Sequence, residues 1–202
     1  MPTTALHVQV RTFIALDLNA AVRTALAAAQ GHLAASGLPL RLSAPAGIHL
    51  TLAFIGEIPA QRVPELIAAV ERGAEGNGPF VLRAESTGMF PNARAPRVVW
   101  AGVQGDAAAM AVLTGLRAGI VRELAAASFP ADSRFDPHLT LARVREGASP
   151  AERAAIGAMV QALPQLGPVE FPVHAVSVMR SQMQTGGSVY TQLAAVPLRA
   201  TS

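Results

Sequence analysis

The apolar positions of this chain alternate between β-type runs and Ala-rich helical segments. In the first half the pattern predicts a strand, a helix, a strand, a helix and two strands, at residues 10–18, 19–35, 48–55, 59–75, 80–85 and 97–103. Asn19 is a favourable N-cap for the first helix, and Pro59 opens the second. Residues 88–96, between the last two of these strands, predict a long exposed loop.

The second half repeats this order with small changes. It predicts a helix, a strand, a helix and two strands, at residues 107–128, 138–145, 150–163, 169–180 and 188–198. Asp106 can cap the first of these helices, and Ser149 with Glu152 forms a capping box for the second. Residues 184–187 are typical of a hairpin turn. The whole order is βαβαβ followed by βαβαββ.

An exact repeat supports a duplication. Residues 49–53 and 138–142 are the same pentapeptide, His-Leu-Thr-Leu-Ala. Two lobes related by a pseudo-twofold axis would place the copies opposite each other across a groove. No Ser- or Gly-rich linker separates the halves. We therefore expect an α+β fold in which residues 1–202 form one bilobal domain, with duplicated antiparallel sheets, flanking helices and a central groove.

The repeated pentapeptide carries groups suited to acid–base chemistry. In a strand, alternate side chains share a face about 6 to 7 Å apart, so His49 lies beside Thr51 and His138 beside Thr140, while the leucines face the core. Imidazole titrates near neutrality, so one ring can accept a proton while the other donates one. Phosphodiester hydrolysis needs such a base and acid on opposite sides of phosphorus, with donors for the non-bridging oxygens. The two threonines would supply those donors, and no metal or cofactor is required.

A structural interpretation competes with this one. A single histidine in a strand is more often structural than catalytic, and threonine is a good strand former. A duplicated fold, however, has no packing reason to retain His and Thr on one polar face twice. The repeat of the pair favours a functional role.

Composition limits the class of protein. With 51% hydrophobic and 14% charged residues among 202, the chain has the composition of a folded protein. All 16 basic residues are Arg, which inflates the pI although the net charge is only +3, so any nucleic acid is expected to bind at an end or over a short segment. Without Cys, disulfides and Cys-ligated zinc are excluded. Charges interrupt the longest apolar segment, residues 107–127, and we expect a soluble, cytoplasmic monomer that does not contact membranes.

The chain resembles the two-histidine phosphoesterase superfamily, and within it the RNA 2′,3′-cyclic phosphodiesterases, also called 2′-5′ RNA ligases. The resemblance covers nearly the whole chain, through residues 11–16, 49–57, 88–91, 96–100 and 137–143 and through Ser181, Gly187 and Tyr190. It implies hydrolysis of an RNA 2′,3′-cyclic phosphate to a 2′-phosphomonoester, with reversible 2′-5′ joining as a further activity.

The resemblance also implies roles for individual residues. His49 is the expected proton donor and His138 the acceptor, although the near-symmetry leaves the roles interchangeable on sequence grounds. Thr51 and Thr140 would contact the phosphate. Three further candidates for substrate contact have equally simple structural explanations: Phe13 as core, Arg143 as a side chain that strict alternation turns away from the groove, and Tyr190 as core or rim.

The remaining candidates and alternatives are weaker. Arg94 and Arg97 are solvated loop charges or RNA contacts, and His7, His32 and His174 are expected to be structural or at the surface. Three alternatives stay open: an RNA-end binding module without activity, a sister enzyme acting on a small cyclic nucleotide or ADP-ribose cyclic phosphate, and a metal site built from His49, His138 and His174.

Overall fold

The computed structural model describes residues 8–132, 134–185 and 187–200, so His7 lies outside the described residues. In chain order its elements are β1 (Gln9–Leu16), α1 (Ala20–Ala35), β2 (Leu40–Leu42), the 3₁₀ turn η1 (Pro45–Gly47), β3 (Leu50–Pro59), η2 (Ala60–Arg62), α2 (Val63–Ala74), β4 (Phe80–Phe90), β5 (Val98–Gln104), α3 (Ala107–Ala126), β6 (His138–Val144), α4 (Pro150–Ala162), β7 (Val169–Val173), β8 (Ala175–Gln184) and β9 (Gly187–Pro197). The predicted caps Asn19, Asp106 and Ser149 each accept a hydrogen bond from the first turn of their helix.

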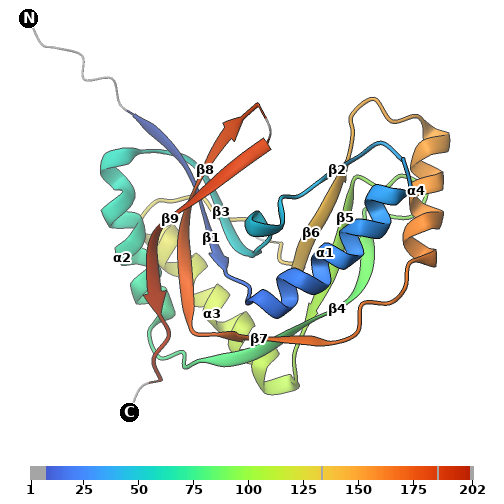
Figure 1. The fold of residues 1–202 in the computed structure, drawn as a ribbon. Coiled ribbons are helices and arrows are strands. Elements are labelled where there is room, and N and C mark those ends of the chain that lie inside the picture. The colour runs from blue at the N-terminus through green and yellow to red at the C-terminus, as the bar shows by residue number, and fades with distance from the viewer. Residues whose placement is uncertain (1–7, 133, 186, 201–202) are drawn as a thin grey trace, which may run out of the picture.

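The strands form two antiparallel halves that meet at the repeated pentapeptides. Their order is β7-β4-β5-β6-β3-β1-β8-β9, with β2 added to β6. β3 and β6 join at the centre through the pairing of Leu50 with Leu139, and each half continues outward through three further strands. Figure 1 shows the two halves as facing arms. The predicted α+β fold with duplicated antiparallel sheets is confirmed.

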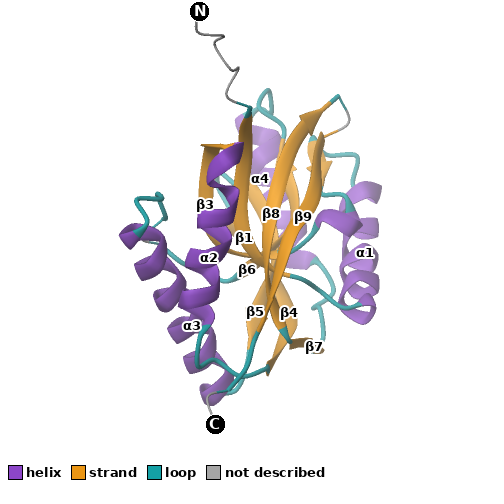
Figure 2. Cartoon of the chain, turned by 90° about the vertical axis from the view of Figure 1, so that its left-hand side faces the viewer, coloured by secondary structure: helices purple, strands orange, loops and turns teal. Residues whose placement is uncertain are grey.

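The helices flank both halves. α2 and α3 pack against each other, and α2 also contacts β8 and β9, whereas α1 contacts β7, β2 and β6, and α4 contacts β4 (Figure 2). Gly73 and Gly119 allow the close crossing of α2 and α3, because a Cβ on Gly119 would lie 2.5 Å from the Gly73 carbonyl oxygen. The leucines of both pentapeptides point into the core, since Leu50, Leu52, Leu139 and Leu141 are each at most 2% exposed.

The structure corrects three expectations. β2 was not predicted, because three residues carry too little periodicity to signal a strand. The predicted loop at residues 88–96 is wrong at its start, since Gly88 to Phe90 continue β4 and pair with β5. The single strand predicted at residues 169–180 is two strands that break at His174, because β7 pairs with β4 in one half and β8 with β1 in the other.

No helix in the described part of the chain is long and apolar enough to cross a membrane.

Candidate functional site

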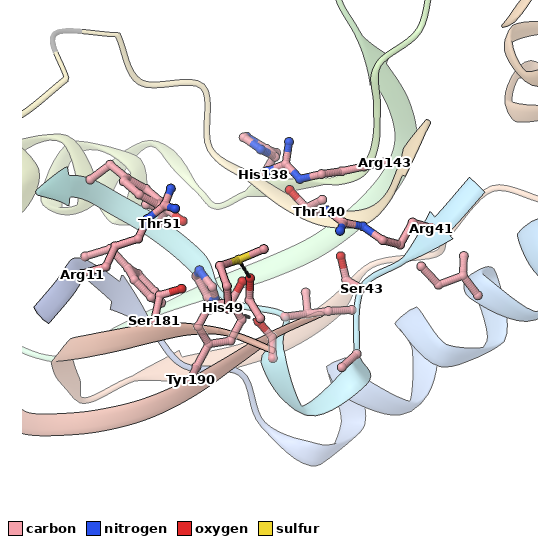
Figure 3. A pocket seen from close by; sticks show the side chains of 18 residues that line it. Arg11, Arg41, Ser43, His49, Thr51, His138, Thr140, Arg143, Ser181 and Tyr190 are labelled. Atoms are coloured by element: carbon pink, nitrogen blue, oxygen red, sulfur yellow. Dashed lines mark hydrogen bonds between the residues drawn. The ribbon is translucent and has the colours of Figure 1, made fainter. Parts of the chain in front are cut away.

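One pocket lies where the two halves face each other. It has a volume of about 480 Å³, within the usual range for small-molecule sites. All seven side chains proposed from the sequence line it: Phe13, His49, Thr51, His138, Thr140, Arg143 and Tyr190. Figure 3 shows the side chains of His49, which directly precedes β3, and of His138, the first residue of β6, in the pocket.

The two histidines are held in the same way. Nδ1 of His49 lies 2.7 Å from the Gly47 carbonyl oxygen, and Nδ1 of His138 lies 2.6 Å from that of Asp136. Each carbonyl is two residues before its histidine and can only accept, so in each ring Nδ1 carries the hydrogen and donates it. Nε2 is then the ring nitrogen available for proton transfer. The duplication therefore preserves the tautomer as well as the residue.

Each imidazole also packs against an aromatic ring. Tyr190 meets His49 edge-on with ring centroids 5.2 Å apart, and Phe90 meets His138 edge-on at the same separation. Gly47 permits the first contact, because a Cβ there would lie 3.0 Å from the Tyr190 ring. These edge contacts restrict rotation of both imidazoles.

The two histidines differ in burial, because a second aromatic ring covers His49. The Phe13 ring stacks on His49, with centroids 4.6 Å apart and planes 26° from parallel. Burial lowers the pKa of His49 below its ordinary value, against the opposing effect of the hydrogen bond to Gly47. In the unliganded protein, His49 is therefore biased toward the neutral ring.

β-Bulges in β3 and β6 re-aim one side chain in each half. The pairing of β6 with β5 skips Leu141, so that Leu141 and Ala142 are both buried and Arg143 turns into the pocket. The bulge breaks the strict alternation that would have turned Arg143 away from the groove. In β3 the pairing with β1 skips Leu52, and Phe54, 39% exposed, takes the equivalent place.

A helix side chain holds each bulge. Gln30 of α1, only 4% exposed, donates through Nε2 to the carbonyl oxygens of Leu141, at 2.8 Å, and Ser43, at 2.7 Å. In the other half, Arg117 of α3 donates through Nε to the carbonyl oxygen of Leu52, at 3.2 Å. These side chains donate hydrogen bonds to backbone carbonyl groups at or next to the irregular pairing. They fix the residues at the end of each pentapeptide.

The other residues proposed from the sequence differ in whether they line the pocket. Phe13 lines the pocket but is only 1% exposed, so it supports His49 and offers little free ring face. Arg94, Arg97, His32 and His174 do not line the pocket.

Sequence reasoning missed several residues that line the pocket, among them Arg11, Arg41, Ser43, Phe54 and Ser181. Phe54 had a detectable signal, since it follows His49 at the same offset at which Arg143 follows His138. Arg41 had none, because its place depends on the pairing of β2 with β6, about 100 residues later.

The described residues do not support the alternative metal site. Within residues 8–132, 134–185 and 187–200, no three His, Cys, Asp or Glu side chains cluster as metal ligands would. His174 lies on the exposed link between β7 and β8, outside the pocket that holds His49 and His138.

Comparison with known proteins identifies the family. The model of the LigT like phosphoesterase family matches two successive segments, residues 16–100 and 105–190, which follow the duplication. A Thermus thermophilus protein named RNA 2′,3′-cyclic phosphodiesterase is 36% identical over 195 residues, covering 94% of this chain and 90% of that protein. A protein of the same name from Methanothermobacter thermautotrophicus is 27% identical over 185 residues, covering 92% of this chain and 97% of that protein.

Solved structures agree with the sequence matches. A Thermus thermophilus crystal structure superposes with a TM-score of 0.75 at 34% identity, covering 95% of this chain and all of that one. Escherichia coli LigT in complex with 3′-AMP gives a TM-score of 0.71 at 25% identity, covering 95% of this chain and 99% of that one. With its duplicated His-x-Thr strands and matches along both halves, the chain belongs to the LigT like phosphoesterase family.

Proposed function

We propose that this protein hydrolyses the 2′,3′-cyclic phosphate at the end of an RNA strand and leaves a 2′-phosphomonoester. The observation that carries this proposal is the duplicated His–Thr pair, at the starts of β3 and β6, around one pocket. The names of the relatives, RNA 2′,3′-cyclic phosphodiesterase, supply the substrate class.

The reaction requires two proton transfers. Nε2 of His138 removes a proton from water as the water oxygen attacks phosphorus. The bond from phosphorus to the 3′ oxygen breaks, and His49 donates a proton from Nε2 to that oxygen. Thr51 and Thr140 donate hydrogen bonds to the non-bridging oxygens. If a 5′-hydroxyl replaces water, the same steps form a 2′-5′ linkage.

The roles of the two histidines follow the family resemblance, and one physical tendency opposes them. Burial lowers the pKa of His49, which favours the neutral ring in the free protein, whereas a donor must enter the reaction protonated. The bound cyclic phosphate carries a negative charge, which raises the pKa of His49 in the substrate complex. We therefore retain His49 as the donor in the substrate complex.

A second candidate function is hydrolysis of a small cyclic nucleotide. It is favoured by neighbouring structures that hold mononucleotide-sized ligands, namely Escherichia coli LigT with 3′-AMP and with ATP. The two candidate functions share the same chemistry at phosphorus. They differ in whether the cyclic nucleotide is the end of an RNA strand or a free small molecule.

The direct test offers RNA with a 2′,3′-cyclic phosphate end and locates the phosphate of the product by phosphorus NMR. We expect a 2′-phosphate, formed at the same rate with and without a chelator. A 3′-phosphate would reverse the assigned leaving group, and binding without turnover would favour the inactive binding module. A second substrate carries sulfur in place of the 3′ oxygen, and this thiolate can leave without being protonated. In the same assay, it should restore the cleavage rate of the His49→Ala variant more than that of the His138→Ala variant.

A further inference from the structure

Two arginines lie side by side at one end of the pocket. Arg41 of β2 and Arg143 of β6 are direct partners in the antiparallel pairing of these strands. Both side chains are exposed and both line the pocket. Figure 3 shows them entering from the same side, next to Thr140, whereas Arg11 lies at the other end near Thr51.

The protein itself does not neutralise this pair. Like charges directly opposite each other on neighbouring strands are destabilising. Among the residues that the structure describes, the ion pairs within 4 Å involve Arg62, Arg72, Arg83 and Arg122, and neither Arg41 nor Arg143 is included. An anion bound in the pocket between the two guanidinium groups would offset this repulsion, which explains why both arginines face the pocket.

The two ends of the pocket differ in chemistry although the fold is duplicated. At the position five residues after each pentapeptide histidine, one half has Phe54 and the other Arg143. The single arginine at the Phe54 end, Arg11, lies over the Phe54 ring, with its guanidinium carbon 5.3 Å from the centroid. Only the β2–β6 end therefore presents two cations together.

The backbone under this pair is fixed. Ser43, directly after β2, donates its backbone N–H to the Leu141 carbonyl oxygen at 2.9 Å. Gln30 bonds to the carbonyl oxygens of the same two residues. β2 is thus tied to the bulge that turns Arg143 into the pocket. The backbone that carries both arginines is therefore held in place by hydrogen bonds.

We propose that Arg41 and Arg143 form a subsite for a second phosphate, the phosphodiester on the 5′ side of the terminal cyclic nucleotide. The inference rests on the proposed function and sets its substrate class: an RNA strand of at least two nucleotides in preference to a cyclic mononucleotide. A guanidinium fork matches phosphate geometry with paired hydrogen bonds. Arg143 is the next groove-facing position beyond Thr140 along β6, which places its charge on the side of the pocket where the next phosphate of an extended strand would lie.

The test compares three substrates that end in the same cyclic uridine phosphate. The first is the mononucleotide, the second a dinucleotide with a normal phosphodiester, and the third a dinucleotide whose linkage is an uncharged methylphosphonate. Loss of a charge-assisted hydrogen bond is worth about tenfold in kcat/KM. We expect Arg41→Ala to lower kcat/KM at least about tenfold more on the phosphodiester dinucleotide than on the mononucleotide, mainly through KM. Arg41→Lys should recover part of the loss.

Two controls make the result specific. Arg145→Ala removes the same charge from an exposed residue of the same region outside the pocket, and it should affect all substrates equally and slightly. Wild-type enzyme should cleave the methylphosphonate at least as poorly as Arg41→Ala cleaves the phosphodiester, because the uncharged linkage also loses its attraction to Arg143. On the methylphosphonate, Arg41→Ala should then cause little further loss.

The contrary outcomes are distinct. Equal losses on mononucleotide and dinucleotide would place Arg41 at the reacting phosphate, and wild-type cleavage of the methylphosphonate at full rate would show that no charge is recognised. A dependence on Arg41 with ADP-ribose cyclic phosphate that exceeds the dependence with the dinucleotide would assign the subsite to a diphosphate. Each overturns this inference alone, whereas failure of the wild type on every cyclic phosphate would overturn the proposed function.

Discussion

At the scale of single residues, the chemistry depends on two imidazoles that are alike in hydrogen bonding and unlike in burial. The carbonyl groups of Gly47 and Asp136 impose the same tautomer on His49 and His138. Phe13 and Tyr190 enclose His49, whereas among the described residues one aromatic ring, that of Phe90, contacts His138. A nearly symmetric pair can thus be biased toward two roles without any change of residue type.

The burial of His49 predicts how stability depends on pH. Because its pKa is lowered in the folded protein, the unfolded chain binds a proton at pH values where the folded one does not. The neutral ring therefore contributes its full stability above pH about 6.5, and this contribution is lost as the pH falls below that value. We expect denaturant unfolding to show a decline in the free energy of unfolding below pH about 6.5 that is smaller in His49→Gln.

The matched control is His32→Gln, which removes an exposed histidine of α1. This variant should retain the pH dependence of the wild type. If His49→Gln and the wild type lose stability in parallel, the burial effect assigned to His49 is absent.

At the scale of elements, the two bulges determine which side chains enter the pocket. Each bulge places two consecutive buried residues at the end of the pentapeptide and brings Phe54 or Arg143 to the same face as the preceding histidine. Since α1 supplies Gln30 to one bulge and α3 supplies Arg117 to the other, the helices contribute to site geometry as well as to the core.

Replacement of Gln30 tests this role. Gln30→Met keeps the length of the side chain but leaves the Ser43 carbonyl oxygen without its buried donor, at a cost of about 1 to 3 kcal/mol. We expect a lower free energy of unfolding in urea and a lower kcat/KM on the RNA substrate, because the segment that carries Arg143 loses a support. Gln161→Met, on the exposed face of α4, should change neither quantity. A Gln30→Met protein as stable and active as the wild type would remove Gln30 from the account.

These elements also show where sequence reasoning succeeds and where it ends. The pentapeptide, the caps and the helices could be predicted because each signal is local, in periodicity or in N-cap chemistry. The bulge at Leu141 could not, since it is defined by a skipped partner on β5. For the same reason Arg41 was missed, and periodicity alone could not decide whether Arg143 faces the groove.

At the scale of the whole molecule, the duplication places like residues on facing strands. β3 and β6 meet at the centre of the strand order, and a His–Thr pair stands at the start of each, with a bulge directly after the threonine. The family model matches each half separately, in agreement with this arrangement. Two similar halves bring two proton-transfer groups to one pocket. The halves differ in having Phe54 at one end of the pocket and Arg143 at the other, so the two ends are chemically distinct.

The central claim is that His49 and His138 act together in one reaction, and a double-mutant comparison tests it most directly. General acid–base catalysis contributes roughly 10²- to 10⁴-fold, so His49→Ala and His138→Ala should each lower kcat on cyclic-ended RNA by that order while the protein stays folded. Because both residues serve the same step, the double variant should be only slightly slower than either single variant. His174→Ala, outside the pocket, should retain full activity. Multiplied losses in the double variant, or near-normal turnover by either single variant, would contradict the account.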